Sequence, residues 1–212
     1  MCLDAASKPY SRQMRRFVVL GQKAKGSGDF LLADIPSTSG RLDVLLRALR
    51  AGLLVSHGVR RDSRVYLALL GEPERARVVR VSGEAARYLR PDERSLAATI
   101  KKALAAPCES AGFVAVRAGI DVAPGTLEGL AEELAGSALY LLEPGAADIR
   151  SASLAAADQT FILGDHLGLS EEARCFFVAR GARTIGVGPV ALYTEDVIAI
   201  VSNELDRRAR SD

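Results

Sequence analysis

Two kinds of hydrophobic pattern divide the first half of the chain into strands and a helix. A nearly continuous apolar run at 65–70 ends at Gly71, which predicts a strand that is covered on both of its faces. Apolar stretches at 17–20 and 78–81 predict two further strands. Between the strands expected at 17–20 and 65–70, leucines at helical spacing predict a helix with one apolar face: Leu42, Leu45, Leu46, Leu49 and Leu53.

After Pro107 the pattern changes to short strands that alternate with helices. Strands are expected at 113–116, 138–142, 160–163 and 184–187. Pro91 is followed by two acids, which favours a helix start, and Ser170 and Thr194 are expected to be N-caps. Helices are therefore expected at 91–104, 126–134, 170–180 and 194–208. This alternation predicts an α/β fold with a mainly parallel sheet flanked by helices.

The composition is that of a globular protein. A chain of 212 residues suffices for one large domain or two small ones. Hydrophobic residues make up 49% and charged residues 25%, which excludes a disordered chain. No apolar run reaches the roughly 18–20 residues that span a bilayer, and the start of the chain lacks a secretory signal. We therefore expect a cytoplasmic protein with no membrane partner.

Cysteines and histidines are too few and too scattered for a metal centre. The three cysteines, Cys2, Cys108 and Cys175, are odd in number and far apart, which argues against a disulfide framework and a zinc site. The two histidines, His57 and His166, cannot by themselves form a histidine-rich site. We expect no metal ion and a reducing compartment.

Charge is distributed unequally between the two halves of the chain. Residues 1–106 hold 20 Lys and Arg against 10 Asp and Glu, whereas residues 107–212 hold 8 against 16. A polyanion such as RNA would be drawn to the first half. Arginine, which outnumbers lysine, also suits phosphate and base recognition. Two alternatives stay open: the halves fold together with the charges spread over a mixed surface, and the arginine bias has another origin, such as a GC-rich genome.

Three expected strand ends carry glycine or proline: 143–145, 164–166 and 188–189. In an open α/β sheet, ligands bind outside the carboxyl ends of the strands, and loops without bulky side chains let the backbone approach a flat ligand. Each loop taken alone is better explained as an ordinary turn, but three in succession favour a ligand cleft. No GxGxxG follows a strand and no GxxxxGK[ST] occurs, which disfavours a Rossmann dinucleotide site and a P-loop.

The densest polar cluster is the segment 56–62, Ser-His-Gly-Val-Arg-Arg-Asp. Two arginines beside a carboxylate could hold a phosphate while the carboxylate accepts a proton. The alternative is a solvated turn between the leucine-rich helix and the following strand.

Five runs of residues occur in this order along the chain: Gly40-Arg41-Leu42-Asp43, Ser56-His57 through Arg60-Arg61-Asp62, Pro91-Asp92-Glu93-Arg94, Ile100 to Leu104 and Ile162 to Gly168. Together they resemble the archaeal tRNA pseudouridine-54 N1-methyltransferases, the TrmY family of the SPOUT superfamily. The resemblance extends from about Met14 to about Arg208. Residues 1–13 lie outside it as an extension, and we expect 14–212 to be a single domain.

The resemblance implies an S-adenosylmethionine-dependent enzyme with a deep C-terminal trefoil knot. It also implies a homodimer whose active site lies at the subunit interface. By motif position, the cofactor would contact Leu141, Gly164, Val187, Gly188, Pro189, Val190, Ala191, Leu192 and Val197. Some relatives have Ser-Pro-Leu-Glu-Leu-His where this chain has residues 188–193, and a cysteine where it has Val197. Because the cofactor contacts there are mostly backbone, we expect binding to survive.

For this family the expected reaction is methyl transfer to N1 of pseudouridine 54 in the T-loop of tRNA. We expect Asp62 to act as base or proton relay, while Arg60 and Arg61 hold phosphate or polarise a carbonyl of the target base. Arg41 and Arg94 are further RNA-binding candidates. A flipped target base is expected, because N1 is unreachable in a folded T-loop. Alternatively, Asp62 only braces its loop through a salt bridge to Arg60 or Arg61.

Two other functions stay open at this point. A related SPOUT enzyme could modify pseudouridine in ribosomal RNA or another RNA. A non-catalytic RNA-binding protein could use the basic half alone, and it would have no measurable affinity for S-adenosylmethionine.

Overall fold

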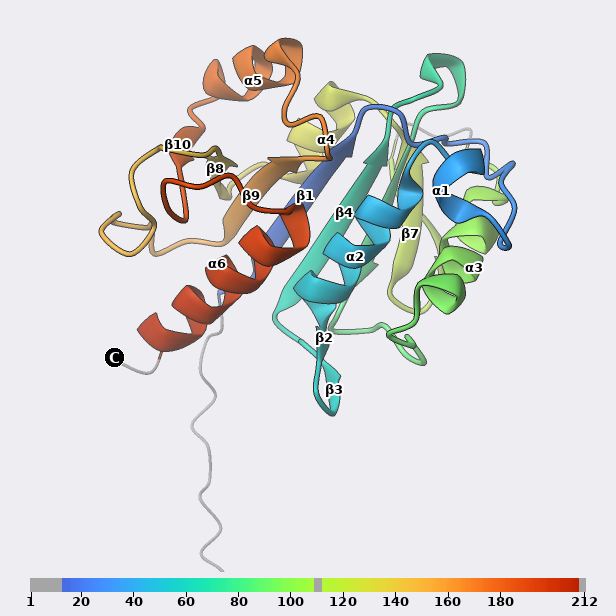
Figure 1. Ribbon diagram of the computed structural model, residues 1–212, viewed down its shortest axis with the longest axis horizontal. Coiled ribbons are helices and arrows are strands. Elements are labelled where there is room, and N and C mark those ends of the chain that lie inside the picture. Colours follow the sequence, from blue (N-terminus) through green and yellow to red (C-terminus); the bar gives the residue numbers. More distant parts are fainter. Residues whose placement is uncertain (1–12, 109–111, 210–212) are drawn as a thin grey trace, which may run out of the picture.

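A computed structural model of the chain describes residues 13–108 and 112–209 and contains one eight-stranded sheet (Figure 1). Its strand order is β10-β8-β9-β1-β4-β5-β7-β6. The strands are β1 Arg15–Gly21, β4 Ser63–Leu69, β5 Arg77–Ser82, β6 Val114–Arg117, β7 Ile120–Pro124, β8 Ala138–Leu142, β9 Gln159–Gly164 and β10 Arg183–Ile185. A separate two-stranded hairpin is formed by β2 Leu54–Val55 and β3 Gly58–Val59.

Five neighbouring strands, from β10 to β4, run parallel, and β5, β7 and β6 continue the sheet in antiparallel fashion. The predicted α/β fold with a mainly parallel sheet is confirmed. Strand β1 lies in the middle, between β9 and β4. The first half and the second half of the chain therefore share one sheet.

The helices follow the expected segments closely. They are α1 Ile35–Thr38, α2 Leu42–Leu53, α3 Glu93–Leu104, α4 Leu127–Glu133, α5 Glu171–Val178 and α6 Thr194–Arg208, with a 3-10 turn η1 at Pro73–Arg75. Ser170 caps α5 by accepting from the Ala173 amide, as expected. The N-cap of α6 is Tyr193 and not Thr194, because the Thr194 hydroxyl donates instead to the carbonyl of Gly164, at 2.8 Å.

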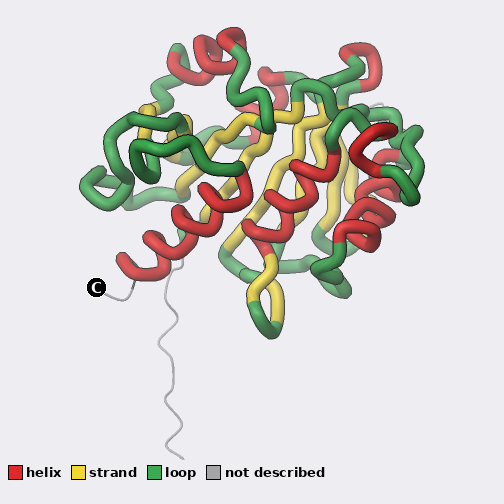
Figure 2. The backbone as a smooth tube through the Cα atoms, in the orientation of Figure 1, coloured by secondary structure: helices red, strands yellow, loops and turns green. Residues whose placement is uncertain are grey.

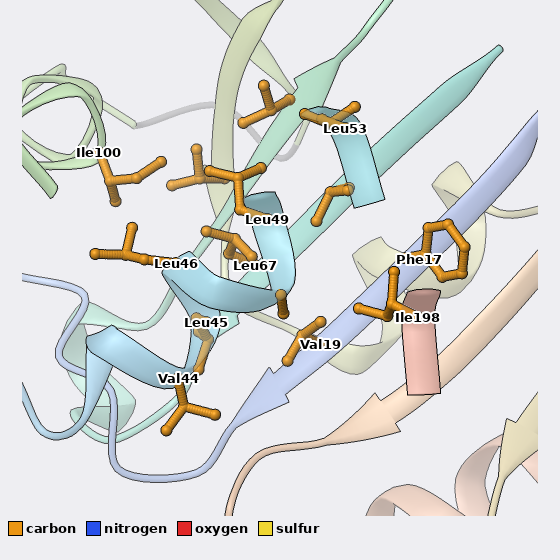
Figure 3. Packing of buried hydrophobic residues seen from close by; sticks show 14 of the residues in the cluster. Phe17, Val19, Val44, Leu45, Leu46, Leu49, Leu53, Leu67, Ile100 and Ile198 are labelled. Carbon is orange, nitrogen blue, oxygen red and sulfur yellow. The ribbon is translucent and has the colours of Figure 1, made fainter. Parts of the chain in front are cut away.

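Both faces of the sheet are covered by helices. Phe17, Val19 and Leu67 point to the face that packs against α2, α3 and α6 (Figure 3). Val18 and Tyr66 alternate with them and lie in a second buried cluster, to which α4 and α5 contribute. Alternate residues of β4 therefore enter different cores, which explains why the apolar run at 65–70 is continuous.

Long loops gather at one side of the parallel strands (Figure 2). The segment from 143 to 158 follows β8, and the segment from 186 to 193 follows β10. The Gly186 amide donates to the Ala147 carbonyl at 2.9 Å, and the Ile149 amide donates to the Gly186 carbonyl at 2.8 Å. These bonds hold the two loops side by side, although about 40 residues separate them in the chain.

Candidate cofactor and RNA-binding site

The loops that follow β8, β9 and β10 meet at the carboxyl edge of the parallel strands, as the three glycine and proline strand ends predict. The Glu143 amide donates to the Ile185 carbonyl at 3.0 Å, which continues the β8–β10 pairing into the loops. The Gly145 amide donates to the Gly188 carbonyl at 3.4 Å. Backbone groups from two loops therefore face each other at this edge.

The turn after β9 is held by the carboxylate of Asp165. This carboxylate accepts hydrogen bonds from the amides of Gln22 and Leu167, both at 2.9 Å. A Cβ on Gly164 would lie 2.0 Å from the backbone of Gly168, so only glycine permits this close turn. The glycine thus serves its own turn, whatever ligand lies beside it.

The segment 187–192 leaves open space at this edge. Gly188 has a φ of 150°, and a Cβ there would meet no atom within 4 Å. Val190 and Leu192 are 67% and 44% exposed, so they offer apolar surface at this edge. Open space, apolar side chains and a backbone without bulk suit a flat purine and a sulfonium group, so the residues present fit S-adenosylmethionine.

Two of the predicted cofactor residues are placed differently from the rest. The side chain of Leu141 is fully buried in the core beneath α4 and α5, so only its backbone can meet a ligand. Val197 is half-buried in the first turns of α6 and packs against the core on the other face. The structure therefore brings Gly164 and the 187–192 segment to one edge, with Leu141 and Val197 beneath it.

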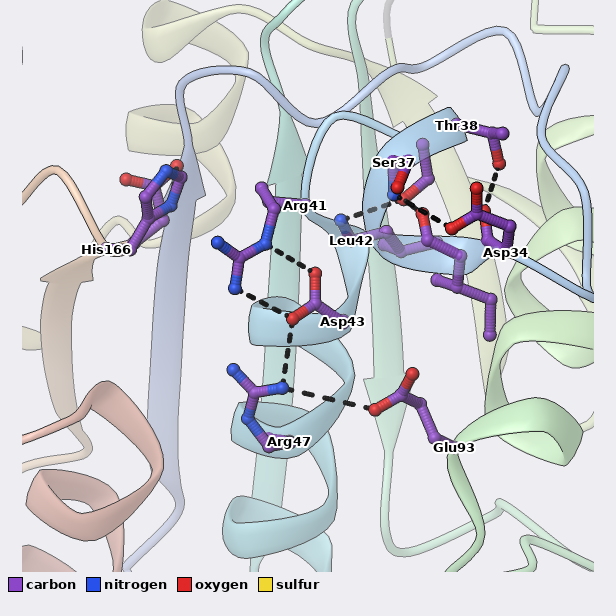
Figure 4. A network of polar contacts seen from close by, with 12 residues as sticks. Asp34, Ser37, Thr38, Arg41, Leu42, Asp43, Arg47, Glu93 and His166 are labelled. Carbon is purple, nitrogen blue, oxygen red and sulfur yellow. Dashed lines mark hydrogen bonds and ion pairs between the residues drawn. The ribbon is translucent and has the colours of Figure 1, made fainter.

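Arg41 also lies near this edge and has an unusual backbone conformation. Its φ is 71°, in the left-handed region that non-glycine residues rarely adopt. Its guanidinium donates twice to Asp43, at 2.9 and 3.0 Å, and Asp43 also accepts from Arg47. Figure 4 shows this network, with His166 across from Arg41. Burial alone would raise the pKa of the Asp43 carboxyl, but the hydrogen bonds from Arg41 and Arg47 outweigh it and lower that pKa.

The expected proton acceptor, Asp62, is buried in an ion pair with Arg15. The two groups are 2.9 Å apart, and their side chains are 7% and 8% exposed. Arg15 also donates to Asp206, which in turn accepts two hydrogen bonds from Arg60, at 2.9 and 2.6 Å. Arg15 is therefore a bracing partner of Asp62, whereas Arg60 pairs with Asp206 and Arg61 donates to backbone carbonyls.

Within one chain, this cluster lies far from the cofactor edge. Arg15 pairs with Ser63 and Gln159 at one end of β1, whereas Leu20 pairs with Gly164 at the other end. Five residues of extended strand span about 16 Å. The structure thus separates Asp62, Arg60 and Arg61 from Gly164, and their catalytic role stays a prediction. Arg94 lies exposed in the first turn of α3.

Comparison with known proteins places the chain in a family. Residues 14–210 match the family described as "Putative SAM-dependent RNA methyltransferase". The chain belongs to this family. A relative from Methanococcoides burtonii, named tRNA (pseudouridine(54)-N(1))-methyltransferase, is 42% identical over 92% of this chain and 96% of its own. A relative of the same name from Pyrococcus abyssi is 36% identical over 92% of this chain and 98% of its own.

The fold of this RNA methyltransferase family member also resembles a solved structure. Nep1 from Archaeoglobus fulgidus, bound to S-adenosylhomocysteine, superposes with a TM-score of 0.60 and covers 93% of this chain and 99% of its own. At 16% identity, this likeness concerns the fold alone. The sequence resemblance to the TrmY family is confirmed by the full-length relatives.

Other features of this methyltransferase lie away from the carboxyl edge. A hollow of about 430 Å³ is lined by Arg80, Phe113 and Glu133, between β5, β7 and α4. Within residues 13–108 and 112–209, no cluster of three His, Cys, Asp or Glu could hold a metal ion. No helix in the same ranges is long and apolar enough to cross a membrane.

The sequence held no signal for the tertiary contacts of three residues in the site area. Arg15 and Asp206 complete the cluster around Asp62, and Thr194 joins α6 to the Gly164 turn. Their partners lie 47, 191 and 30 residues away, so no periodic pattern or local motif links them.

Proposed function

We propose that the protein transfers a methyl group from S-adenosylmethionine to N1 of pseudouridine 54 in tRNA. The observation that carries this proposal is the 42% identity, over nearly the whole of both chains, to a tRNA (pseudouridine(54)-N(1))-methyltransferase. Membership of an RNA methyltransferase family that depends on S-adenosylmethionine supports the same chemistry.

S-adenosylmethionine would lie at the carboxyl edge, against the backbone of Gly164 and of residues 187–192, with Leu141 and Val197 beneath. When bound, it supplies a methyl group on a sulfonium, which needs no metal ion. The open space at Gly188 and the exposed Val190 and Leu192 support this placement. The paired loops at 143–158 and 186–193 would form the deep trefoil knot that the family resemblance implies, and their backbone bonds support that arrangement.

A homodimer would resolve the separation between Asp62 and the cofactor edge. N1 of pseudouridine loses its proton as its lone pair takes the methyl group, so a proton acceptor has to lie within hydrogen-bond distance. Asp62 meets this requirement only if the cluster of one subunit faces the carboxyl edge of the other. The exposed apolar side chains of Val190, Leu192 and Tyr193 support an interface at that edge.

Nucleoside analysis by mass spectrometry tests the proposal. The protein would be incubated with methyl-labelled S-adenosylmethionine and tRNA that carries pseudouridine at position 54. Labelled N1-methylpseudouridine is expected, and the same tRNA with uridine at position 54 should gain no label, because its N1 carries the glycosidic bond.

A pseudouridine-bearing ribosomal RNA fragment is the second control. Labelling of the fragment and not of the tRNA would replace the proposed substrate with ribosomal RNA. No heat of S-adenosylmethionine binding in calorimetry would instead favour the non-catalytic RNA-binding alternative.

A further inference from the structure

Tyr88 combines full exposure with an uncommon backbone conformation. Its side chain is 92% exposed, and its φ is 58°. A bulky residue in the left-handed region is an outlier, and such strain persists only where the surrounding structure imposes it. The next residue, Leu89, packs against the core. The loop at Tyr88 therefore presents an aromatic ring to solvent, and this ring adds no buried apolar surface to the folded state.

The loop that carries Tyr88 is held by contacts on both sides. Arg61 donates to the carbonyls of Gly83 and Glu84, at 3.0 and 3.1 Å. Arg117 donates to the carbonyl of Arg87 at 2.9 Å, directly before Tyr88. These contacts come from the start of β4 and the end of β6, so the ring stands on a supported loop.

Four arginines lie on the loop that carries Tyr88 or contact its backbone. We call Arg61, Arg87, Tyr88, Arg90 and Arg117 the Tyr88 patch; all five are exposed. In the described part of the chain, none of these arginines forms an ion pair with a carboxylate. The nearby acids are engaged otherwise: Glu84 approaches Arg64 at 4.0 Å, and Asp92 caps α3 by accepting from the Ser95 amide at 2.8 Å.

We propose that Tyr88 stacks on an unpaired nucleobase of the RNA substrate, while the arginines of the Tyr88 patch bind the adjoining phosphates. Exposed aromatic rings among arginines are the usual means by which proteins hold single-stranded RNA, because every base offers a face for stacking. This inference rests on the proposed function, which supplies the RNA as the partner. It adds a contact with a nucleotide other than the target.

The Tyr88 patch and the cofactor edge of the same chain lie at opposite ends of the sheet. The patch lies at the amino end of β4, the same end of the sheet as Asp62 and opposite to Gly164. Stacking on Tyr88 should therefore strengthen RNA binding without touching the cofactor edge of the same chain. We expect changes at Tyr88 to alter KM and the dissociation constant for tRNA, and to leave the affinity for S-adenosylmethionine unchanged.

Two variants of Tyr88 separate stacking from backbone effects. Tyr88→Asn removes the ring while asparagine tolerates the left-handed conformation, and Tyr88→Phe keeps the ring. Loss of one stacked base should raise the dissociation constant for tRNA roughly fivefold to a hundredfold in Tyr88→Asn. Tyr88→Phe should stay within about twofold of the wild type. Filter binding at one fixed salt concentration measures both.

A direct readout is available because the chain contains no tryptophan. In Tyr88→Trp, tryptophan emission should be quenched when tRNA is added, since the base would stack on the indole. Val178→Trp is the matched control, because Val178 is 47% exposed at the C-terminal end of α5, outside the Tyr88 patch. Its emission should not change.

The charges of the patch are tested through the salt dependence. Arg87→Gln and Arg90→Gln should each lower the slope of log affinity against log salt by about 1, whereas Arg180→Gln, just after α5, should not alter it. Unchanged tRNA binding in Tyr88→Asn would overturn the proposal. If light scattering also shows that Tyr88→Asn changes the number of subunits in the assembly, the ring belongs to a protein interface instead. Quenching by tRNA without any methyl transfer would defeat the proposed function and leave the stacking contact standing.

Discussion

At the scale of single residues, the Arg15–Asp62 ion pair decides how Asp62 can be interpreted. Both groups are buried, so removal of one leaves the other charged in a poorly solvated place. We expect Asp62→Asn to lower the free energy of unfolding by on the order of 3 kcal/mol, measured by denaturant unfolding. Affinity for S-adenosylmethionine should persist, because the expected role of Asp62 is to accept the N1 proton of the target base and not to hold the cofactor.

Turnover of folded Asp62→Asn distinguishes a proton acceptor from a brace, with Arg15→Met as the matched control. Arg15→Met breaks the same pair but keeps the carboxylate. If Asp62 accepts the N1 proton, methyl transfer should fall much further in Asp62→Asn than in Arg15→Met. Equal losses in both variants would leave Asp62 only a bracing role.

Gly164 offers a second residue-scale prediction. An alanine Cβ there would lie 2.0 Å from the Gly168 backbone, so the turn has to move, and its bond to Thr194 moves with it. We expect Gly164→Ala to weaken S-adenosylmethionine binding at least tenfold in calorimetry. Gly58→Ala is the control, since a Cβ there meets nothing within 4 Å, and its cofactor affinity should equal that of the wild type. Equal affinities in all three proteins would contradict a cofactor site at this turn.

At the scale of elements, the predictable parts are those whose pattern depends on burial alone. The apolar run at 65–70 became β4 Ser63–Leu69, and the leucine stripe became α2. Strand β7, Ile120–Pro124, was not predicted, because it is short and ends in proline. Its pairing with β5 and β6 defines it, and the sequence does not show that pairing.

The same limit applies to the site. The glycine and proline strand ends predicted the carboxyl edge, because strand ends are local features. The partner of Asp62 could not be predicted, since Arg15 reaches it only after β1 and β4 have paired in register. The Thr194 hydroxyl was expected to cap α6, but a tertiary acceptor, the Gly164 carbonyl, takes its hydrogen bond.

At the scale of the whole molecule, the uneven charge of the two halves contributes to folding as well as to RNA attraction. Arginines of the first half pair with acids of the second half: Arg15 and Arg60 with Asp206, Arg16 with Asp158, and Arg47 with Glu195. Strand β1 lies between strands of both halves. The halves therefore fold together, while the exposed arginines of the Tyr88 patch stay available for phosphate.

These ion pairs predict acid sensitivity of the folded state. Burial alone would raise the pKa of Asp206, but the hydrogen bond from Arg60 and the charge of Arg15 outweigh it and lower that pKa. The pKa of Asp43 is lowered in the same way. A carboxyl with a lowered folded-state pKa stabilises the fold above its unfolded pKa of about 3.9, and this contribution is lost as pH falls through the folded value.

Thermal unfolding midpoints should therefore be level from pH 7 to pH 5 and fall below about pH 4 as these two carboxylates protonate. Asp206→Asn should lower the midpoint at pH 7 and fall less steeply in acid, because one of the titrating groups is gone. Parallel curves for the two proteins would show that Asp206 does not contribute to the acid transition.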